Sequence, residues 1–467
     1  MTDAGSAAPS KSPPHASSFT GRRGLVAALA IAVVAAAMIW PWVLAERDSF
    51  SQKSFDHDRF HLPLVRSFAS QWPAVDLSDY DSATGPGYHL ALATAAQVLG
   101  DGETTLQMLG SLFAIGLLAT VAWRLARWRG SELEGLLLTL PLASSPYLLG
   151  NAIWLMTDNL SLWLVSVPVL GAIMLPATPL RLGRWGVATA AACVVRQINL
   201  WVIGPIVLAA WFATRPSSAN LAEPTEAPRR RLVVFAALAC LLPMAVVAGF
   251  AWLWGGLTPP TFQQYHAVSV QPAAVPYGLS LFGVYGAPLW FVIGASGLER
   301  GRVPRWFLLT ASLGWAAFTM AGESFAGLEV GRNGGWLWTM VAQTPTVGGV
   351  SLLLAAGSAV GMVLLMQLIA VAFGRGESCG RSSIVAAVVL AAFLVAHAAN
   401  KQLFQRYFDA PVLLVLLALT ALAWPRRGDG PSVDPRSDRS WILAVGLMAA
   451  MQVAFATATL FLPLAAG

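Results

Sequence analysis

Apolar segments long enough to cross a lipid bilayer recur along almost the whole chain. The first extends from Gly24 to Ala45, about 22 residues, and a bilayer core requires roughly 20 apolar residues per helix. Hydrophobic residues make up 56% of the sequence and charged residues only 11%, which excludes an ordinary soluble domain. We therefore expect an all-α, multi-pass (polytopic) membrane protein without a large soluble domain.

Further apolar runs follow the first one. They cover residues 105–123, 133–152, 157–178, 185–213, 232–254, 278–297, 306–322, 347–373, 383–400, 409–424 and 441–463. The run 185–213 has Arg181 and Arg184 before it and Arg215 after it, so both of its ends are expected on the cytoplasmic side. This pattern predicts two short helices with a bend at Arg196 and Gln197, and about thirteen spans in all, with the N-terminus inside.

Positive charge orients the predicted spans. Most of the 29 Lys and Arg residues fall in segments that this layout places in the cytoplasm, as the bias of basic residues toward inner loops requires. The net charge of +6 is thereby explained without a nucleic-acid partner. Residues 1–23 are rich in Ser, Pro and Ala and are predicted to be a disordered cytoplasmic tail, and residues 24–467 to form the membrane domain.

The first predicted outer loop, residues 46–104, carries a dense group of titratable side chains. Asp56, His57, Asp58 and His61 lie within six positions of a chain that has few charges. Carboxylates beside imidazoles suit general acid/base catalysis on the non-cytoplasmic face. Asp58 is the first candidate for the base, Asp56 is the alternative, and His61 is a further catalytic candidate. Either carboxylate could instead cap the helix that Pro63 is expected to begin, over residues 63–71.

Cations elsewhere suit an anionic substrate. Arg406 with Tyr407 is the favoured phosphate site, because a guanidinium holds two phosphate oxygens at once, and Arg332 is a second outer cation. Arg196 interrupts an apolar run, so it either binds phosphate or pairs with Asp158. The three cysteines are far apart in the sequence, and neither a disulfide framework nor a metal site is predicted.

Several stretches together resemble one known family. They are Asp58 to Pro63, Gln71-Trp72, Thr84 to Tyr88, Trp154 to Ser161, Val195 to Trp201, Gly255-Gly256 with His266, and Gln405 to Phe408. In this order they are similar to the motifs of the dolichyl-phosphate-glucose α-1,2-glucosyltransferases, which add the terminal glucose to the lipid-linked oligosaccharide of N-glycosylation. The Asp-Glu pair of that family falls on His57 and Asp58 in this chain.

The resemblance implies a glycosyltransferase with a GT-C type helix bundle. Such an enzyme would transfer a hexose, glucose by resemblance, from a polyprenyl-phosphate sugar to a lipid-linked or cell-envelope glycan, with inversion. It would need no cofactor other than the lipid donor and no metal, and its partners would be the donor, the glycan acceptor and membrane lipids. The substrate contacts that we expect, beside the cations above, are His57, Trp72, Tyr88, Asp158, Gln197 and His266.

Two other classes of protein have to be weighed. A transporter or flippase for a lipid or solute would also be polytopic and basic inside, but it would often carry internal repeats, and none is found. A membrane acyltransferase would centre on a histidine in or beside an apolar helix, and His397 is the candidate. Functional residues gathered on one side of the membrane would favour the transferase.

Overall fold

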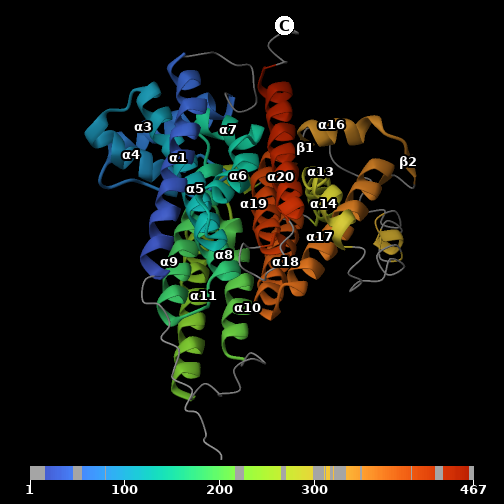
Figure 1. Ribbon diagram of the computed structural model, residues 1–467. Helices are drawn as coiled ribbons and strands as arrows, with labels where there is room; N and C mark the ends of the chain where they lie inside the picture. Colours follow the sequence, from blue (N-terminus) through green and yellow to red (C-terminus); the bar gives the residue numbers. More distant parts are fainter. Residues whose placement is uncertain are drawn as a thin grey trace, which may run out of the picture.

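The computed structural model describes residues 16–45, 55–78, 80–215, 226–263, 270–297, 310, 312–315, 319, 333–347, 350–400, 402–425 and 435–461. Helices dominate these residues (Figure 1). The described strands are two residues long: β1 (Asn333–Gly334) pairs in parallel with β4 (Leu403–Phe404), and β2 (Thr346–Val347) pairs antiparallel with β3 (Val350–Ser351). The predicted all-α architecture is confirmed. His266, Arg332, Lys401 and residues 1–15 lie outside the described part.

In the described residues, seven helices are long and apolar enough to cross a membrane. They lie in α1 (Ala16–Leu44), α5 (Glu103–Arg129), α11 (Glu226–Trp254), α17 (Leu352–Gly374), α18 (Glu377–Ala398), α19 (Gln405–Ala423) and α20 (Pro435–Ala456), which continues into η4 (Thr457–Phe461). The bent pair α6 (Glu132–Ala143) and α7 (Pro146–Ile153) can be counted as an eighth span. The count of thirteen spans stays a prediction.

Shorter helices complete the bundle. They are α3 (Leu62–Gln71), α4 (Gly87–Leu99), α8 (Asp158–Met174), α9 (Pro179–Val195), η2 (Gln197–Val202), α10 (Ile203–Ala213), α12 (Pro260–Gln263), α13 (Ala274–Tyr285), α14 (Leu289–Gly297) and α16 (Trp336–Gln343). The break predicted at Arg196 and Gln197 is present between α9 and η2. The helix predicted from Pro63 is α3.

Three helix boundaries differ from the apolar pattern. Helix α1 begins at Ala16, eight residues before the predicted start. Once a helix has formed, each further residue needs to be ordered only by itself, and no proline after Pro14 interrupts this extension. The runs 133–152 and 278–297 are each divided into two helices. The divisions fall at Pro146 and Pro288, since the residue before a proline avoids the helical conformation.

Helix α19 lies at the centre of the bundle. In its most apolar window 83% of the residues are buried, against 17% in α11. Figure 1 shows α1, α5 and α6 on one side of α19 and α13, α14 and α17 on the other, with α11 at the periphery. The long α11 therefore presents most of its apolar surface outward, as a helix facing lipid does.

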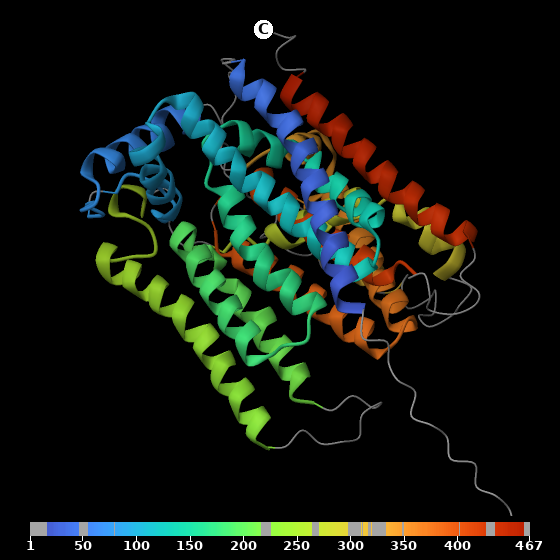
Figure 2. The ribbon, with the colours of Figure 1, turned by 60° about the vertical axis from the view of Figure 1, so that its left-hand side comes forward.

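The first loop is docked onto one end of the bundle. Gly85 N–H donates to the Val195 carbonyl at the end of α9 (2.9 Å), and Trp254 Nε1 at the end of α11 donates to the Leu77 carbonyl (3.1 Å). Figure 2 shows α11 ascending one side of the bundle to end beside the helices of this loop. The segments that the charge pattern places on the outer side thus lie together.

Arginines gather at the opposite end. Arg129 at the end of α5 donates to the carbonyls of Trp424 and Pro425, after α19, and pairs with Glu134 at 2.7 Å. Arg375, after α17, donates to the Ala423 carbonyl at 3.3 Å. These positions belong to segments predicted to be cytoplasmic, so the charge asymmetry of the sequence becomes a difference between the two ends of the bundle.

We predict that single cysteines at exposed positions will report this orientation. In a cysteine-free background, Asp101→Cys should react from outside with a membrane-impermeant thiol reagent. Arg184→Cys and Arg215→Cys should react only after the membrane is opened, because α9 and α10 return to the side from which they started. Outside labelling at position 215 alone would show instead that residues 185–213 cross the membrane once.

Candidate active site

Arg196 and Asp158 form an ion pair at the point where one helix ends and another begins. Helix α9 stops before Arg196, whose backbone is extended, and α8 starts at Asp158. The two side chains are 15% and 13% exposed, so each charge is neutralised where an unpaired charge would be costly. The Arg196 guanidinium also lies 4.6 Å from the centre of the Tyr407 ring. The pairing, one of the two roles predicted for Arg196, is confirmed.

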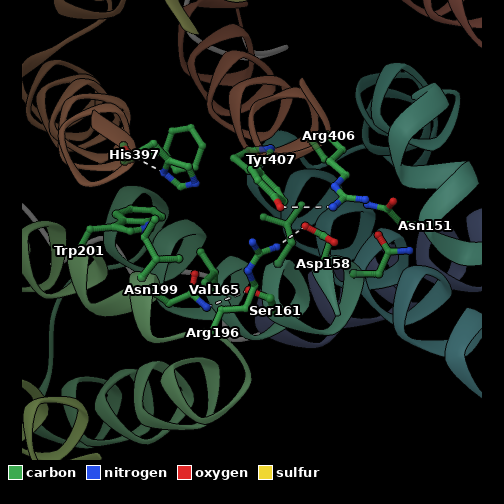
Figure 3. Close-up of a pocket in the computed structure, with 16 residues that line it drawn as sticks. Asn151, Asp158, Ser161, Val165, Arg196, Asn199, Trp201, His397, Arg406 and Tyr407 are labelled. Atoms are coloured by element: carbon green, nitrogen blue, oxygen red, sulfur yellow. Dashed lines mark hydrogen bonds and ion pairs between the residues drawn. The ribbon is translucent and has the colours of Figure 1, made fainter. Parts of the chain in front are cut away.

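A second ion pair also lies beside Tyr407. Arg406, in the first turn of α19, donates from Nη1 to Asp56 at 2.6 Å and from Nη2 to the Tyr407 hydroxyl at 3.3 Å. Figure 3 shows Tyr407 beside both arginines. Two aspartates balance the two arginines, so the cluster carries no net formal charge.

Asp56 and Asp58 project from different sides of the same turn. Asp56 is 13% exposed and contacts Arg406, whereas Asp58 is 68% exposed and lies 3.7 Å from His57 Nε2. Side chains two positions apart in a helix point about 200° apart, so only one of two such carboxylates can face the arginines. Asp56 is the one that does, and Asp58, the first candidate from the sequence, points elsewhere.

His57 is held by hydrogen bonds at both ring nitrogens. The backbone N–H of Leu155 donates to Nδ1 at 3.1 Å, and Nε2 lies 3.2 Å from Glu103 Oε1. Because Nδ1 accepts, the neutral ring carries its proton on Nε2 and donates it to Glu103. Ligand atoms of His57, Asp58 and Glu103 lie within 4.8 Å of one another, but this tautomer leaves no lone pair on Nε2 for a metal. The histidine ties the first loop to the start of α8.

His61 ends a buried chain of hydrogen bonds that the sequence did not reveal. The Tyr80 hydroxyl donates to the Gly85 carbonyl (3.0 Å) and lies 2.8 Å from His89 Nδ1, and His89 Nε2 lies 2.9 Å from His61 Nδ1. Tyr80 has a single proton, so His89 donates to it and His61 donates to His89. The chain therefore fixes His61 with an acceptor lone pair on Nε2.

Of the other residues predicted to contact substrate, Gln197 lies next to Arg196, whereas Trp72 and Tyr88 belong to the first loop. Trp72 is 41% exposed just after α3, away from the arginine pairs. Tyr88 is buried and packs edge-on against His61 and Phe113, so it belongs to the core of the loop. Gln197 lies beside Arg196, and its Nε2 is buried with no hydrogen-bond partner in the described part of the chain.

Two cavities share Arg196 and Tyr407 in their linings. The smaller has a volume of about 50 Å³ and is lined by Asn151, Asp158 and Arg406, among others (Figure 3). The larger, about 610 Å³, has mainly apolar walls that include Val247 and Val395 and lies among η2, α11 and α18. The residues that line both cavities are Arg196, Ile198, Trp201 and Tyr407.

Some residues of the smaller cavity were missed as sites in the sequence. Asn151 on α7 and Asn199 on η2 both line it, as does His397 on α18, which the sequence had singled out only as the candidate centre of an acyltransferase. The available signal was a polar side chain inside an apolar run, the same signal that singled out Arg196. It was too common along this chain to select these residues without the fold that brings them together.

No model of a known protein family matches this sequence, and no curated protein matches it either. Among solved structures, it resembles the archaeal oligosaccharyltransferase AglB from Archaeoglobus fulgidus, in complex with an inhibitory peptide and a dolichol-phosphate. The identity is 14% and the TM-score 0.51 over 95% of this chain. This chain spans 56% of the length of AglB. The predicted GT-C type bundle is thereby confirmed.

Two structures of ArnT from Cupriavidus metallidurans are more distant. The apo state has a TM-score of 0.37 at 14% identity, with 92% of this chain and 77% of ArnT covered. The form bound to undecaprenyl phosphate has a TM-score of 0.38 at 14% identity, with 93% and 77% covered.

We predict that His61 makes the folded protein sensitive to acid. Burial, with Arg406 nearby, lowers the pKa of His61 to about 3, from 6.5 in an unfolded chain. Between these two values the unfolded state binds the extra proton, so stability is lost as the pH falls from about 6.5 toward 3. The melting temperature in detergent should therefore drop less for His61→Gln than for wild type between about pH 7 and pH 4.5. An equal drop in melting temperature for the two proteins would show that His61 is not the source of the acid sensitivity.

Proposed function

We propose that this protein is a glycosyltransferase that uses a polyprenyl-phosphate sugar as donor and transfers a hexose to a lipid-linked or cell-envelope glycan. The observation that carries the proposal is the junction of the two cavities at Arg196. A large apolar space and a small space with several polar side chains share a cation in their linings, and a polyprenyl-phosphate sugar likewise has its anion between an apolar chain and the hydroxyls of a sugar. Glucose is the first sugar to test, because of the motif resemblance.

Arg196 suits the phosphate better than Arg406 does. It lines both cavities, and Nη1 is its only nitrogen with a hydrogen-bond partner among the residues described, so further N–H groups are available to phosphate oxygens. Arg406 lines only the smaller cavity and holds Asp56. We assign phosphate binding to Arg196 and positioning of Asp56 to Arg406.

Asp56 is the group that would act as base. In a single displacement, the acceptor hydroxyl oxygen forms a bond to the anomeric carbon while the bond from that carbon to the phosphate oxygen breaks. The hydroxyl proton passes to the carboxylate and the leaving group departs as polyprenyl phosphate, stabilised by a cation. Attack from the side opposite the phosphate inverts the anomeric carbon. Asp56 would take the proton and Arg196 would hold the phosphate, and Tyr407 lies beside Arg196 and beside the Arg406 that pairs with Asp56.

We predict that Asp56→Asn lowers turnover by about 10²- to 10⁴-fold, the usual contribution of a positioned base, while donor binding persists. Turnover is measured as release of polyprenyl phosphate by the protein in lipid nanodiscs, with a panel of labelled polyprenyl-phosphate sugars and a membrane glycolipid extract as acceptor. Asp81→Asn, an exposed carboxylate of the same loop, is the matched control and should stay near wild type.

The same assay separates the competing possibilities. If Asp58→Asn is inactive and Asp56→Asn is active, the base is Asp58, as the sequence suggested first. If wild type moves a labelled lipid across the bilayer and releases no polyprenyl phosphate from any donor, the protein is a flippase or transporter and the proposal fails.

We predict different defects for the two arginines. Replacement of Arg196 by Lys keeps the charge but removes the planar fork, so donor affinity should fall roughly 10- to 100-fold, the scale of a charge-assisted hydrogen bond. Arg406→Lys should mainly lower turnover, because Asp56 loses its support. Separate donor titrations of both variants decide the point, and a loss of donor affinity confined to Arg406→Lys would return the phosphate to Arg406.

A further inference from the structure

His397 presents a fixed hydrogen-bond acceptor to the smaller cavity. It is 5% exposed, and its Nδ1 lies 3.0 Å from the carbonyl oxygen of Phe393, one turn earlier on α18. A carbonyl only accepts, so the proton is on Nδ1 and Nε2 of the neutral ring keeps its lone pair. Figure 3 shows the opposite edge of the ring directed toward the space between Trp201 and Tyr407.

Aromatic packing prevents this ring from turning. The Phe393 ring lies 4.2 Å and the Phe408 ring 5.1 Å from the imidazole, measured between ring centres. Within the described residues, Nε2 of His397 has no hydrogen-bond partner. A buried acceptor that is held in place and left unpaired is costly unless a ligand or water satisfies it.

Two further polar atoms of the same cavity also lack partners. Oδ1 of Asn151, a residue only 4% exposed, and Nε of Arg406 are buried without a hydrogen-bond partner in the described residues. The residues that line the cavity thus carry two acceptor atoms and one donor atom without a partner. Hydroxyl groups both donate and accept, so a ligand that carries hydroxyls suits this mixed lining.

The size and charge of the cavity narrow the ligand further. Its volume of about 50 Å³ admits a few water-sized groups, at roughly 10–15 Å³ each, and not a whole sugar ring. The phosphate is assigned to Arg196, which the smaller cavity shares with the larger one, so the rest of the smaller cavity is left for an uncharged part of the donor. An edge of a pyranose ring that carries free hydroxyls meets both conditions.

We propose that the smaller cavity binds a hydroxyl-bearing edge of the donor sugar and that Nε2 of His397 accepts a hydrogen bond from one of these hydroxyls. This inference rests on the proposed function and makes His397 a specificity-determining residue. The required sugar has a free hydroxyl at the position that meets His397, and a sugar that is deoxygenated or substituted there is disfavoured.

Analogues of the donor test the inference in the wild-type protein. The sugar that wild type transfers in the donor panel is prepared as a series of polyprenyl-phosphate donors, each lacking one hydroxyl or carrying fluorine in its place. Fluorine accepts but does not donate a hydrogen bond. At the position that meets His397, the deoxy and fluoro donors should both bind roughly 10- to 100-fold more weakly than the parent in competition assays.

The variant His397→Phe assigns the effect to this residue. Phenylalanine keeps the packing against Phe393 and Phe408 but has no nitrogen, so the variant should bind the parent donor and that deoxy donor about equally. Ser383→Ala is the matched control, because it removes a buried hydrogen bond to a carbonyl of the same helix at Gly380. It should keep the wild-type preference.

Three results would overturn the inference. One is a fluoro donor that binds as well as the parent at every position where the deoxy donor is weak. Another is His397→Phe that binds all donors more weakly by the same factor and keeps the preference for the hydroxyl. If wild type transfers no sugar at all, the proposed function itself fails and His397 loses its role with it, an outcome distinct from the other two.

Discussion

An arginine inside an apolar run is stable only if its charge is paired, and the site is arranged around the pair that Arg196 forms. Arg196 pairs with Asp158, and the pair is almost fully enclosed. Burial of two charges costs several kcal/mol for each ion unless the geometry compensates it. One helix therefore ends at Val195 and another begins at Asp158, where the aspartate also lies at the favourable N-terminal end of a helix. The pair thus lies where two breaks in the bundle meet.

The first loop and the centre of the bundle converge on these breaks. Gly85 binds the carbonyl of Val195, and His57 accepts from the N–H of Leu155, so the loop covers the ends of α9 and α8. Asp56 then reaches Arg406 on the central helix α19. The carboxylate of Asp56, the two arginines and the residues shared by the two cavities therefore lie close together where the first loop meets the bundle.

The sequence predicts those features of the site that a single unfavourable residue reveals by its immediate neighbours in the chain. A cation in an apolar run predicts the break at Arg196 and its pairing with Asp158. Other features depend on direction in space. The choice between Asp56 and Asp58 depends on which side of a turn faces the bundle, and the order of residues in the loop does not reveal that side. The role of His397 depends on residues that only the fold brings near it, and the apolar pattern did not show the proline breaks that divide two of the runs.

The central claim is that a lipid phosphate binds where the two cavities meet. The most direct measurement is the structure of the protein bound to a non-reactive phosphonate analogue of its polyprenyl-phosphate sugar donor. The account predicts that the phosphonate contacts Arg196, that the isoprenoid chain occupies the larger cavity between α11 and α18, and that an edge of the sugar points toward His397. A phosphonate bound away from Arg196, or a chain that leaves the larger cavity empty, would contradict it.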